Sequence, residues 1–391
     1  MEANYLIRVL DAPSEISPRD WDRLVDLAND PSPFIRHAYL NALHESGAAT
    51  EATGWMPRFV TLWRDDHLEA ACPLYIKSHS YGEYVFDWAW AQAYDQHGLD
   101  YYPKGVVAIP FTPVPGARLL ARDADARQAL VRRLQALAGA WNLSSLHLLF
   151  ARDGDVQVAA GQGWMNRETV QFHWEQGRSG DGTTAAFRDF NAFLGSLQQE
   201  KRKKIRQERR KVADAGVRFR WATGSDIPEA DWTFFWRCYE RTYHEHGNPP
   251  YLNPDFFRCI AHDMPAHWLL FVGEKDGCPI ASSLIGLDPQ RRIAYGRYWG
   301  AMERIDCLHF EACYYQPLQW CIENGYQRFE GGAQGEHKMA RALLPVRARS
   351  AHWLAHPAFA DAVDRFLNRE RQGISGYMAH LASRDPRRRE V

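Results

Sequence analysis

The order of expected secondary structure repeats along this chain, and this repetition constrains the fold more than any other feature. In each half a helix start is followed by a β-hairpin, a further strand, a helix and a last strand. The helix starts at 33–40 and 250–257 share their order of residue types and their apolar spacing. A shared order of elements indicates an internal duplication.

Alternating apolar residues, turn residues and helical periodicity place the elements of the two halves. We expect a hairpin, a strand, a helix and a strand over 58–75, 84–90, 123–141 and 146–150, and again over 268–287, 292–299, 308–324 and 326–330. Hairpins give antiparallel pairs, and the helix between the last two strands allows one crossover. The sequence therefore predicts an α/β (α+β) fold with mixed, mostly antiparallel sheets flanked by helices.

The chain has 391 residues, which is long for one core, and its 46% hydrophobic content is enough for two. Residues 176–184 are rich in Gly, Ser and Thr, the composition of a linker. We therefore expect an N-terminal domain over residues 1–178 and a C-terminal domain over residues 179–391.

Charge and cysteine content exclude several classes. The formal net charge of -1 gives no overall attraction for nucleic acid or membrane, and the seven cysteines are scattered without paired spacing. We expect no disulfide framework, no metal site, no signal peptide and no membrane span, and hence a cytoplasmic protein. The chain also lacks a Walker phosphate loop, a His-Glu-x-x-His helix and a Gly-x-Ser-x-Gly elbow.

A strongly basic helix is expected over residues 191–215, with Gly216 after its end. Eight of the eleven residues from Lys201 to Lys211 are basic. Two interpretations stay open: a solvated helix face with i,i+4 pairs, or a surface that binds RNA, a phosphorylated lipid or a cofactor phosphate.

The segment 294–345 carries the strongest candidate site. A glycine loop is closed by two cations, Lys338 and Arg341, a combination that suits an anionic ligand because flexible amides converge on phosphate oxygens. The glycines of this loop are Gly331, Gly332 and Gly335. The alternative is a glycine turn followed by a solvated charged segment.

Three side chains are candidate proton acceptors. Glu311 lies off the apolar stripe of the helix 308–324, so it can act as a general base toward an amine or simply place charge at the helix start. His309 and His337 are the alternatives, because the unperturbed pKa of histidine lies near physiological pH. Pro317 is expected to kink this helix.

Two further arginines, one in the segment 294–345 and one in the first half, also receive candidate roles. Tyr295, Arg297 and Trp299 should share one face of a strand, where Arg297 either lines a substrate groove or packs between the aromatic rings. In the first half, Arg118 follows a proline-rich loop and either binds a phosphate at a helix start or belongs to a rigid cleft wall.

The segments 295–300, 308–315 and 329–341 resemble the FemAB-like family of peptidoglycan biosynthesis or recognition proteins, as do 110–120 and the basic helix. The resemblance spans nearly the whole chain. It implies a tandem pair of GNAT-type N-acyltransferase domains, in which the acyl donor lies against a splayed sheet and an amine attacks the acyl carbonyl. It also implies that Lys338 lies near the phosphates of donor or acceptor.

The resemblance and the residues together predict an N-acyltransferase that moves an acyl group, other than an aminoacyl group, from acyl-CoA or a similar donor to a primary amine. The amine belongs to a small molecule or a peptidoglycan precursor, and the chemistry lies in the C-terminal domain. Two alternatives stay open. One is an aminoacyl-tRNA-dependent peptidyltransferase that contacts tRNA through 201–211, and the other is a non-catalytic module for anionic cell-wall or lipid groups.

Overall fold

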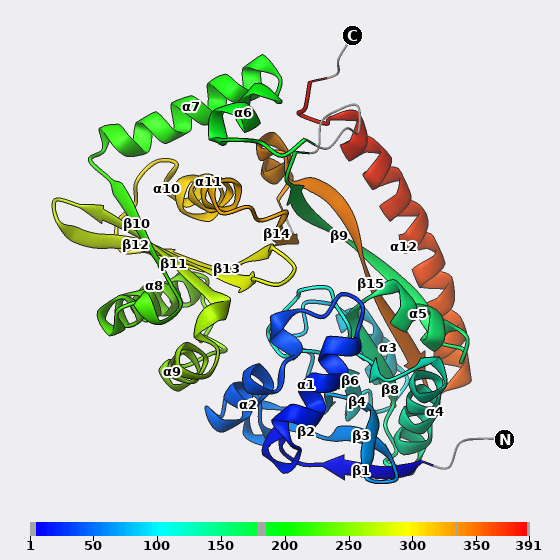
Figure 1. Cartoon of the computed structure of the whole chain (residues 1–391). Helices are drawn as coiled ribbons and strands as arrows, with labels where there is room; N and C mark the ends of the chain where they lie inside the picture. The colour runs from blue at the N-terminus through cyan, green and yellow to red at the C-terminus, as the bar shows by residue number, and fades with distance from the viewer. Residues whose placement is uncertain (1–4, 178–184, 334, 389–391) are drawn as a thin grey trace. The chain divides into compact units, whose positions relative to one another are not determined.

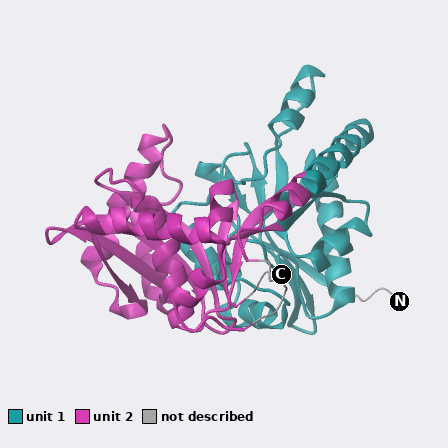
Figure 2. Ribbon diagram, turned by 90° about the horizontal axis from the view of Figure 1, so that it is seen from above, with its two compact units in different colours: residues 1–169, 347–376 teal, residues 170–346, 377–391 magenta. Residues whose placement is uncertain are grey.

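The computed structural model describes residues 5–177, 185–333 and 335–388 (Figure 1). The chain divides into two compact units (Figure 2): unit 1 contains residues 1–169 and 347–376, and unit 2 contains residues 170–346 and 377–391. The division is discontinuous in sequence, so several elements have residues in both units. The expected boundary between residues 178 and 179 lies outside the described residues and stays a prediction.

Unit 1 contains two sets of strands. The first has the order β1-β3-β4-β7 and is antiparallel throughout: β1 (Leu6–Leu10), β3 (Phe59–Arg64), β4 (His67–Cys72) and β7 (Leu120–Ala121). The second has the order β15-β8-β6-β5-β2, in which only β6 and β8 run parallel. Its members are β2 (Trp55–Pro57), β5 (Leu74–Lys77), β6 (Lys104–Val107), β8 (Ser145–Ala151) and β15 (Leu344–Leu354).

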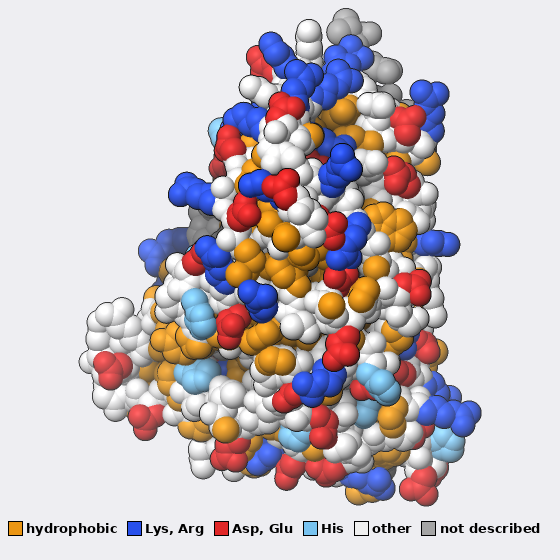
Figure 3. All heavy atoms as spheres, turned by 90° about the vertical axis from the view of Figure 1, so that its left-hand side faces the viewer, with side chains coloured by type: hydrophobic (Ala, Val, Ile, Leu, Met, Phe, Trp, Pro, Cys, Tyr) orange, Lys and Arg blue, Asp and Glu red, His pale blue; other side chains and the backbone are white. Residues whose placement is uncertain are grey.

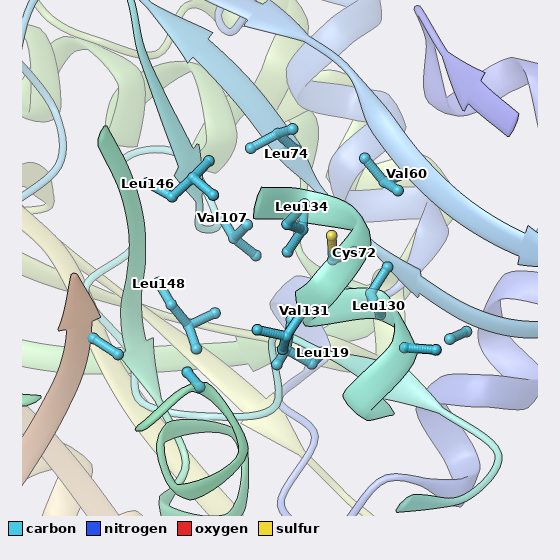
Figure 4. Close-up of a cluster of buried hydrophobic side chains, with 14 of the residues drawn as sticks. Val60, Cys72, Leu74, Val107, Leu119, Leu130, Val131, Leu134, Leu146 and Leu148 are labelled. Carbon is cyan, nitrogen blue, oxygen red and sulfur yellow. The ribbon is translucent and has the colours of Figure 1, made fainter. Parts of the chain in front are cut away.

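The helices of unit 1 begin where local signals place them. Ser17 caps α1 (Pro18–Leu27) by accepting the Asp20 N–H, and Asp123 caps α4 (Ala124–Ala140) by accepting the Ala126 N–H. The buried face of α4 packs Leu130, Val131 and Leu134 against the strands (Figure 4). The other helices are α2 (His37–Glu45), α3 (Trp88–Gln96), α5 (Asp153–Ala160) and part of α12 (Pro357–Ser383).

The strand expected over residues 84–90 is wrong, because α3 begins inside this segment. The Asp87 carbonyl accepts the N–H groups of Trp90 and Ala91 and so starts the helix. The Asp87 carboxylate is held by the buried cation Lys104. Tertiary contacts therefore override the β-propensity of the aromatic residues here.

Arg118 is fully buried, and no helix starts beside it. Its side chain donates to the carbonyl oxygens of Val114 at 2.6 Å and Leu149 at 3.0 Å. Gly116 forms a parallel bridge with Ala151 at the end of β8, beyond the residues that pair with β6. The loop that carries Arg118 thus occupies the place where β6 and β8 separate, which agrees with the rigid-wall interpretation.

Unit 2 contains strands in the order β10-β11-β12-β13-β14-β9. Every neighbouring pair is antiparallel except β13 and β14, which run parallel. The strands are β9 (Met165–Glu175), β10 (Arg218–Thr223), β11 (Trp268–Lys275), β12 (Cys278–Asp288), β13 (Ile293–Ala301) and β14 (Arg328–Ala333). The β11–β12 hairpin turns at Asp276 and Gly277, both at positive φ, as a two-residue turn requires.

The helices of unit 2 lie between these strands in the chain. They are α6 (Phe190–Gly195), α7 (Gln199–Asp214), α8 (Glu229–Glu245) and α9 (Pro254–Asp263). The single helix expected over 191–215 is therefore divided into α6 and α7. The crossover between β13 and β14 consists of α10 (Leu308–Phe310), a π-helical turn (Glu311–Tyr315) and α11 (Gln316–Glu323). The irregular turn ends two residues before Pro317, close to the expected kink.

The fold class that the sequence predicts is confirmed: each unit combines a mixed, mostly antiparallel sheet with flanking helices.

Candidate active site

Strands β13 and β14 separate near their middle and leave a cavity between them. Residues Ile293–Tyr295 of β13 pair with Arg328–Glu330 of β14, and the described residues that follow in the two strands do not pair with each other. Beyond that point lies a cavity of about 140 Å³, which we call the splay cavity. It is lined by strand residues Ser283, Ile285, Gly296, Arg297, Tyr298, Trp299, Phe329 and Gly331 and by crossover residues His309, Cys313 and Tyr314.

A β-bulge places Arg297 in the wall of the splay cavity. The register of β12 and β13 passes from Leu284 opposite Tyr298 to Ile285 opposite Gly296, so Arg297 is the extra residue. Its Nη2 donates to the Tyr298 hydroxyl at 2.7 Å. The bulge also breaks the expected alternation, because consecutive residues of β13 now reach the cavity.

Tyr295 does not share the position of Arg297. It belongs to the paired part of β13 and is only 2% exposed. Burial raises the pKa of its hydroxyl well above the usual value. Tyr295 therefore lies in the core, at the base of the point where the strands separate.

His309 lines the splay cavity as a neutral imidazole. Its ring centroid lies 4.6 Å from that of Trp299 and 5.7 Å from that of Tyr314. Burial, with smaller effects from His337, Arg341 and Lys338, lowers its pKa to about 4. At neutral pH the ring is therefore unprotonated, and the lowered pKa also makes it a weaker base than an ordinary histidine.

His337 lies beside His309, and Tyr314 connects it to the cavity. The two imidazole centroids are 6.3 Å apart, and His337 Nε2 is 3.3 Å from the Tyr314 hydroxyl. Burial raises the pKa of Tyr314, so this hydroxyl keeps its proton. Sequence reasoning missed Tyr314 as a functional residue, because it counted as one position of the apolar stripe.

Glu311 points its carboxylate at α7. It is 4% exposed, accepts from Arg209 Nε at 3.1 Å, and forms an ion pair with Arg209 Nη2 at 3.0 Å. The Gln316 side chain donates to the same carboxylate at 2.7 Å. The general-base role of Glu311 stays a prediction, whereas these contacts show that it holds α7 against the crossover.

Lys338 and Arg341 are buried beneath the glycine loop. Lys338 Nζ donates to the carbonyl oxygens of Gly331 and Ala333, each at 2.7 Å. Arg341 is 1% exposed and donates to the His337 carbonyl at 2.6 Å and to Glu208 at 2.7 Å. In this arrangement the two cations fix the backbone of the loop, and their role toward phosphates or an oxyanion stays a prediction.

The glycines meet steric needs of the loop. A Cβ on Gly331 would lie 2.3 Å from Leu343 and 3.0 Å from the Phe172 carbonyl oxygen. Gly332 and Gly335 have φ of 73° and 92°, values that side chains rarely adopt. Residue 334, which the expected loop includes, lies outside the described residues.

The basic helix α7 has one buried and one exposed face. Ile205, Glu208 and Val212 are buried. The exposed face carries Lys203, Lys204, Arg206, Arg210 and Lys211. In Figure 3 such blue side chains gather in the upper part of the view, where Figure 1 places α7. Lys211 is paired with Asp306 at 2.6 Å.

Within residues 5–177, 185–333 and 335–388, no group of three or more His, Cys, Asp or Glu side chains is arranged to hold a metal ion. In the same residues, no helix has the length and apolar character needed to cross a membrane.

Comparison with known proteins defines the class of this chain. Residues 12–389 match the profile of the FemAB-like family, described as peptidoglycan biosynthesis/recognition. The chain therefore belongs to the FemAB-like family.

Solved structures share this fold at low sequence identity. FemX matches with a TM-score of 0.54 and 11% identity, over 89% of this chain and 98% of that chain. L-PGS from Bacillus licheniformis matches with a TM-score of 0.52 and 11% identity, over 90% and 97%. A tandem GNAT protein from the clavulanic acid biosynthesis pathway matches with a TM-score of 0.46 and 13% identity, over 90% and 99%. A search of curated proteins found no match.

The family description places the chain among peptidoglycan biosynthesis or recognition proteins, and the solved structures show its fold.

Proposed function

We propose that the protein is an N-acyltransferase that moves an acyl group from acyl-CoA or a similar donor to a primary amine in the splay cavity. The observation that carries this proposal is the separation of β13 from β14 with the neutral His309 in its wall. Where two strands separate, their backbone N–H and C=O groups are no longer paired with each other and there is space for a ligand. A bound acyl donor needs both the space and these hydrogen-bonding groups.

In the proposed reaction the amine nitrogen attacks the acyl carbonyl carbon. The new C–N bond forms, the bond from the carbonyl carbon to the leaving atom breaks, and the amine releases one proton. His309 accepts that proton, since its imidazole is neutral at working pH. Tyr314 gives its proton to the leaving thiolate. His309 then releases the amine's proton to solvent, and solvent returns one proton to Tyr314 through His337, whose Nε2 is 3.3 Å from the Tyr314 hydroxyl.

The remaining predicted residues take supporting roles in this proposal. Arg297 faces the cavity and offers positive charge to an anionic part of a substrate. Lys338 and Arg341 hold the glycine loop in the shape that borders the cavity. Glu311, the base preferred from the sequence, positions Arg209 and with it α7.

A second candidate donor is an aminoacyl-tRNA, with a peptidoglycan precursor as acceptor. The observation that favours it is the exposed basic face of α7, whose neighbouring residues Glu208 and Arg209 contact Arg341 and Glu311. A polyanion bound to this face would thus lie on a helix that touches the elements of the splay cavity. Lysine and arginine arrays of this kind bind phosphate backbones.

One experiment tests both donors. The purified protein is incubated with acetyl-CoA or with a charged tRNA pool, together with a lysine-containing peptide, and the peptide is analysed by mass spectrometry. An N-acetylated peptide supports the first donor, and an aminoacylated peptide supports the second. A peptide that stays unmodified with both donors contradicts acyl transfer from acetyl-CoA and from aminoacyl-tRNA. That result favours a non-catalytic module for anionic ligands.

A further inference from the structure

Exposed aromatic side chains are concentrated in one stretch of unit 1. Of the nine large hydrophobic side chains that are exposed in the described part of the chain, five lie between Tyr81 and Leu99. Four of them lie within residues 81–88, which we call the aromatic face: Tyr81 (57% exposed), Tyr84 (38%), Phe86 (59%) and Trp88 (42%). The rings of Tyr81 and Trp88 meet edge to face, with centroids 5.1 Å apart.

The segment alternates between exposed rings and buried acids. Glu83 and Asp87 point inward, and Lys104, which is fully buried, donates to both carboxylates and to Ser80 at 2.8 Å. A buried cation that holds two acids of one short segment fixes the backbone between them. The rings on the opposite side are therefore held in place.

Two further cations hold the backbone itself. Lys77 Nζ donates to the Tyr81 carbonyl oxygen at 3.3 Å, and Arg167 Nη1 donates to the Phe86 carbonyl oxygen at 2.7 Å. Tyr84 has φ of 59°, a left-handed conformation that is unusual for a bulky residue. Such strain persists only where the surroundings enforce it, and it is common at ligand-binding positions. The aromatic face is therefore preorganised, which lowers the entropy cost of binding.

The charges around the aromatic face restrict its ligand. No lysine or arginine occurs between Lys77 and Lys104, and both of these are buried. The exposed ionisable side chains of the following segment are Asp95, His97 and Asp100. Within residues 78–103, exposed carboxylates without exposed arginine or lysine disfavour nucleic acids, phosphates and anionic lipid headgroups.

Amide side chains accompany the rings. Trp88, Gln92 and Gln96 follow one another at i, i+4 and i+8 on α3, so they lie along one side of the helix. Gln92 and Gln96 are both exposed. Flat apolar faces suit the C–H faces of pyranose rings, and amides beside them suit hydroxyl groups at the ring edges.

We propose that the aromatic face of unit 1 binds a neutral oligosaccharide by stacking pyranose rings on Trp88 and Tyr81. The aromatic face shares no residue with the splay cavity, and the proposal goes beyond the proposed acyl transfer. The proposal thus assigns a ligand to unit 1 itself. This ligand is neutral, unlike the phosphate that was one alternative for the buried Arg118.

Isothermal titration of the full chain with chitotetraose and, separately, with maltotetraose tests this proposal. We expect saturable binding of at least one oligosaccharide. Trp88→Ala should weaken it by about tenfold or more, because the substitution removes a central aromatic ring. Trp221→Ala is the matched control, since Trp221 is 50% exposed in unit 2, and it should leave binding unchanged. Trp88→Phe keeps a ring and should retain most of the affinity.

Three results would overturn the proposal. The first is that neither oligosaccharide binds to the wild-type chain. The second is equal weakening by Trp88→Ala and Trp221→Ala. The third is that Trp88 is needed for binding to phosphatidylglycerol vesicles, or for self-association in sedimentation, but not for oligosaccharide binding. Because the titration involves no acyl donor, its result does not depend on whether the protein transfers acyl groups.

Discussion

Glu208 and Arg341 form a buried ion pair, with Arg341 Nη2 2.7 Å from Glu208 Oε2. The side chains are 9% and 2% exposed, and the Tyr315 hydroxyl also donates to Glu208. The Arg341 guanidinium carbon lies 3.7 Å from the centre of the Phe310 ring. This pair joins the basic helix α7 to the segment that carries His337 and Lys338.

Loss of the Glu208–Arg341 ion pair should lower the free energy of unfolding substantially. Glu208→Ala leaves the buried Arg341 without its carboxylate, and we expect the free energy of unfolding to fall by about 3 kcal/mol. Urea unfolding measures the change. Asp306→Ala is the control, because the Lys211–Asp306 pair is largely exposed (47% and 76%) and should contribute less than about 1 kcal/mol. Equal effects of the two substitutions would contradict the structural role of Glu208.

Gly331 should not tolerate a methyl group. In Gly331→Ala the new Cβ would overlap Leu343 and crowd the Phe172 carbonyl oxygen, so we expect a loss of about 1–3 kcal/mol. Gly373→Ala gives the contrast, because no atom lies within 4 Å of its Cβ position in α12. In that helix alanine should be neutral or stabilising by up to about 1 kcal/mol. Thermal unfolding of the Gly331→Ala and Gly373→Ala proteins measures the two changes in stability.

Stability should fall on acidification through the histidines. Burial lowers the pKa of His309 to about 4 and that of His147 and His173 to about 3. Between about pH 6.5 and these values the unfolded chain binds protons that the folded chain does not, so the free energy of unfolding decreases as pH falls.

His309→Gln should remove its share of this slope between about pH 6.5 and 4. His262→Gln, at a side chain that is 87% exposed, should not change the slope. Denaturant unfolding at a series of pH values gives the measurement. An unchanged slope in His309→Gln would contradict the neutral state assigned to this imidazole.

The exposed face of α7 should determine any affinity for tRNA. Substituting Lys203, Arg206 and Arg210 with alanine should weaken binding and make the plot of log affinity against log salt less steep, by about 0.7 for each phosphate that is no longer neutralised. Arg19→Ala with Arg133→Ala is the control, since both side chains are exposed in unit 1. Filter binding at several salt concentrations distinguishes the two sets. A slope that does not change in the α7 variant would exclude α7 as the tRNA-binding surface.

Local signals made much of the fold predictable. Ser17 followed by Pro18, and Asp123 before α4, are helix starts that depend only on neighbouring residues. The turn at Asp276–Gly277 likewise follows from residues that accept positive φ. Most residues that line the splay cavity, His309 and Arg297 among them, belong to the segment 294–345 that sequence reasoning selected, whereas Ser283 and Ile285 lie outside it.

Contacts between distant residues could not be predicted in this way. Lys338 and Arg341 resemble exposed phosphate ligands in the sequence, but carbonyl groups and Glu208 surround them in the fold. The helix α3 replaces an expected strand because Lys104 holds Asp87. The position of Arg297 depends on a β-bulge, and no residue pattern in β13 predicts this bulge.

The rate of acyl transfer by His309→Gln tests the central proposal most directly. With whichever donor gives product, we expect the rate to fall by about 10²–10⁴-fold, the usual contribution of a general base, while the melting temperature stays near that of the wild type. His262→Gln should retain the wild-type rate. Full activity in a folded His309→Gln protein, or a loss of turnover confined to folded Glu311→Gln, would contradict the assignment of His309 as the proton acceptor.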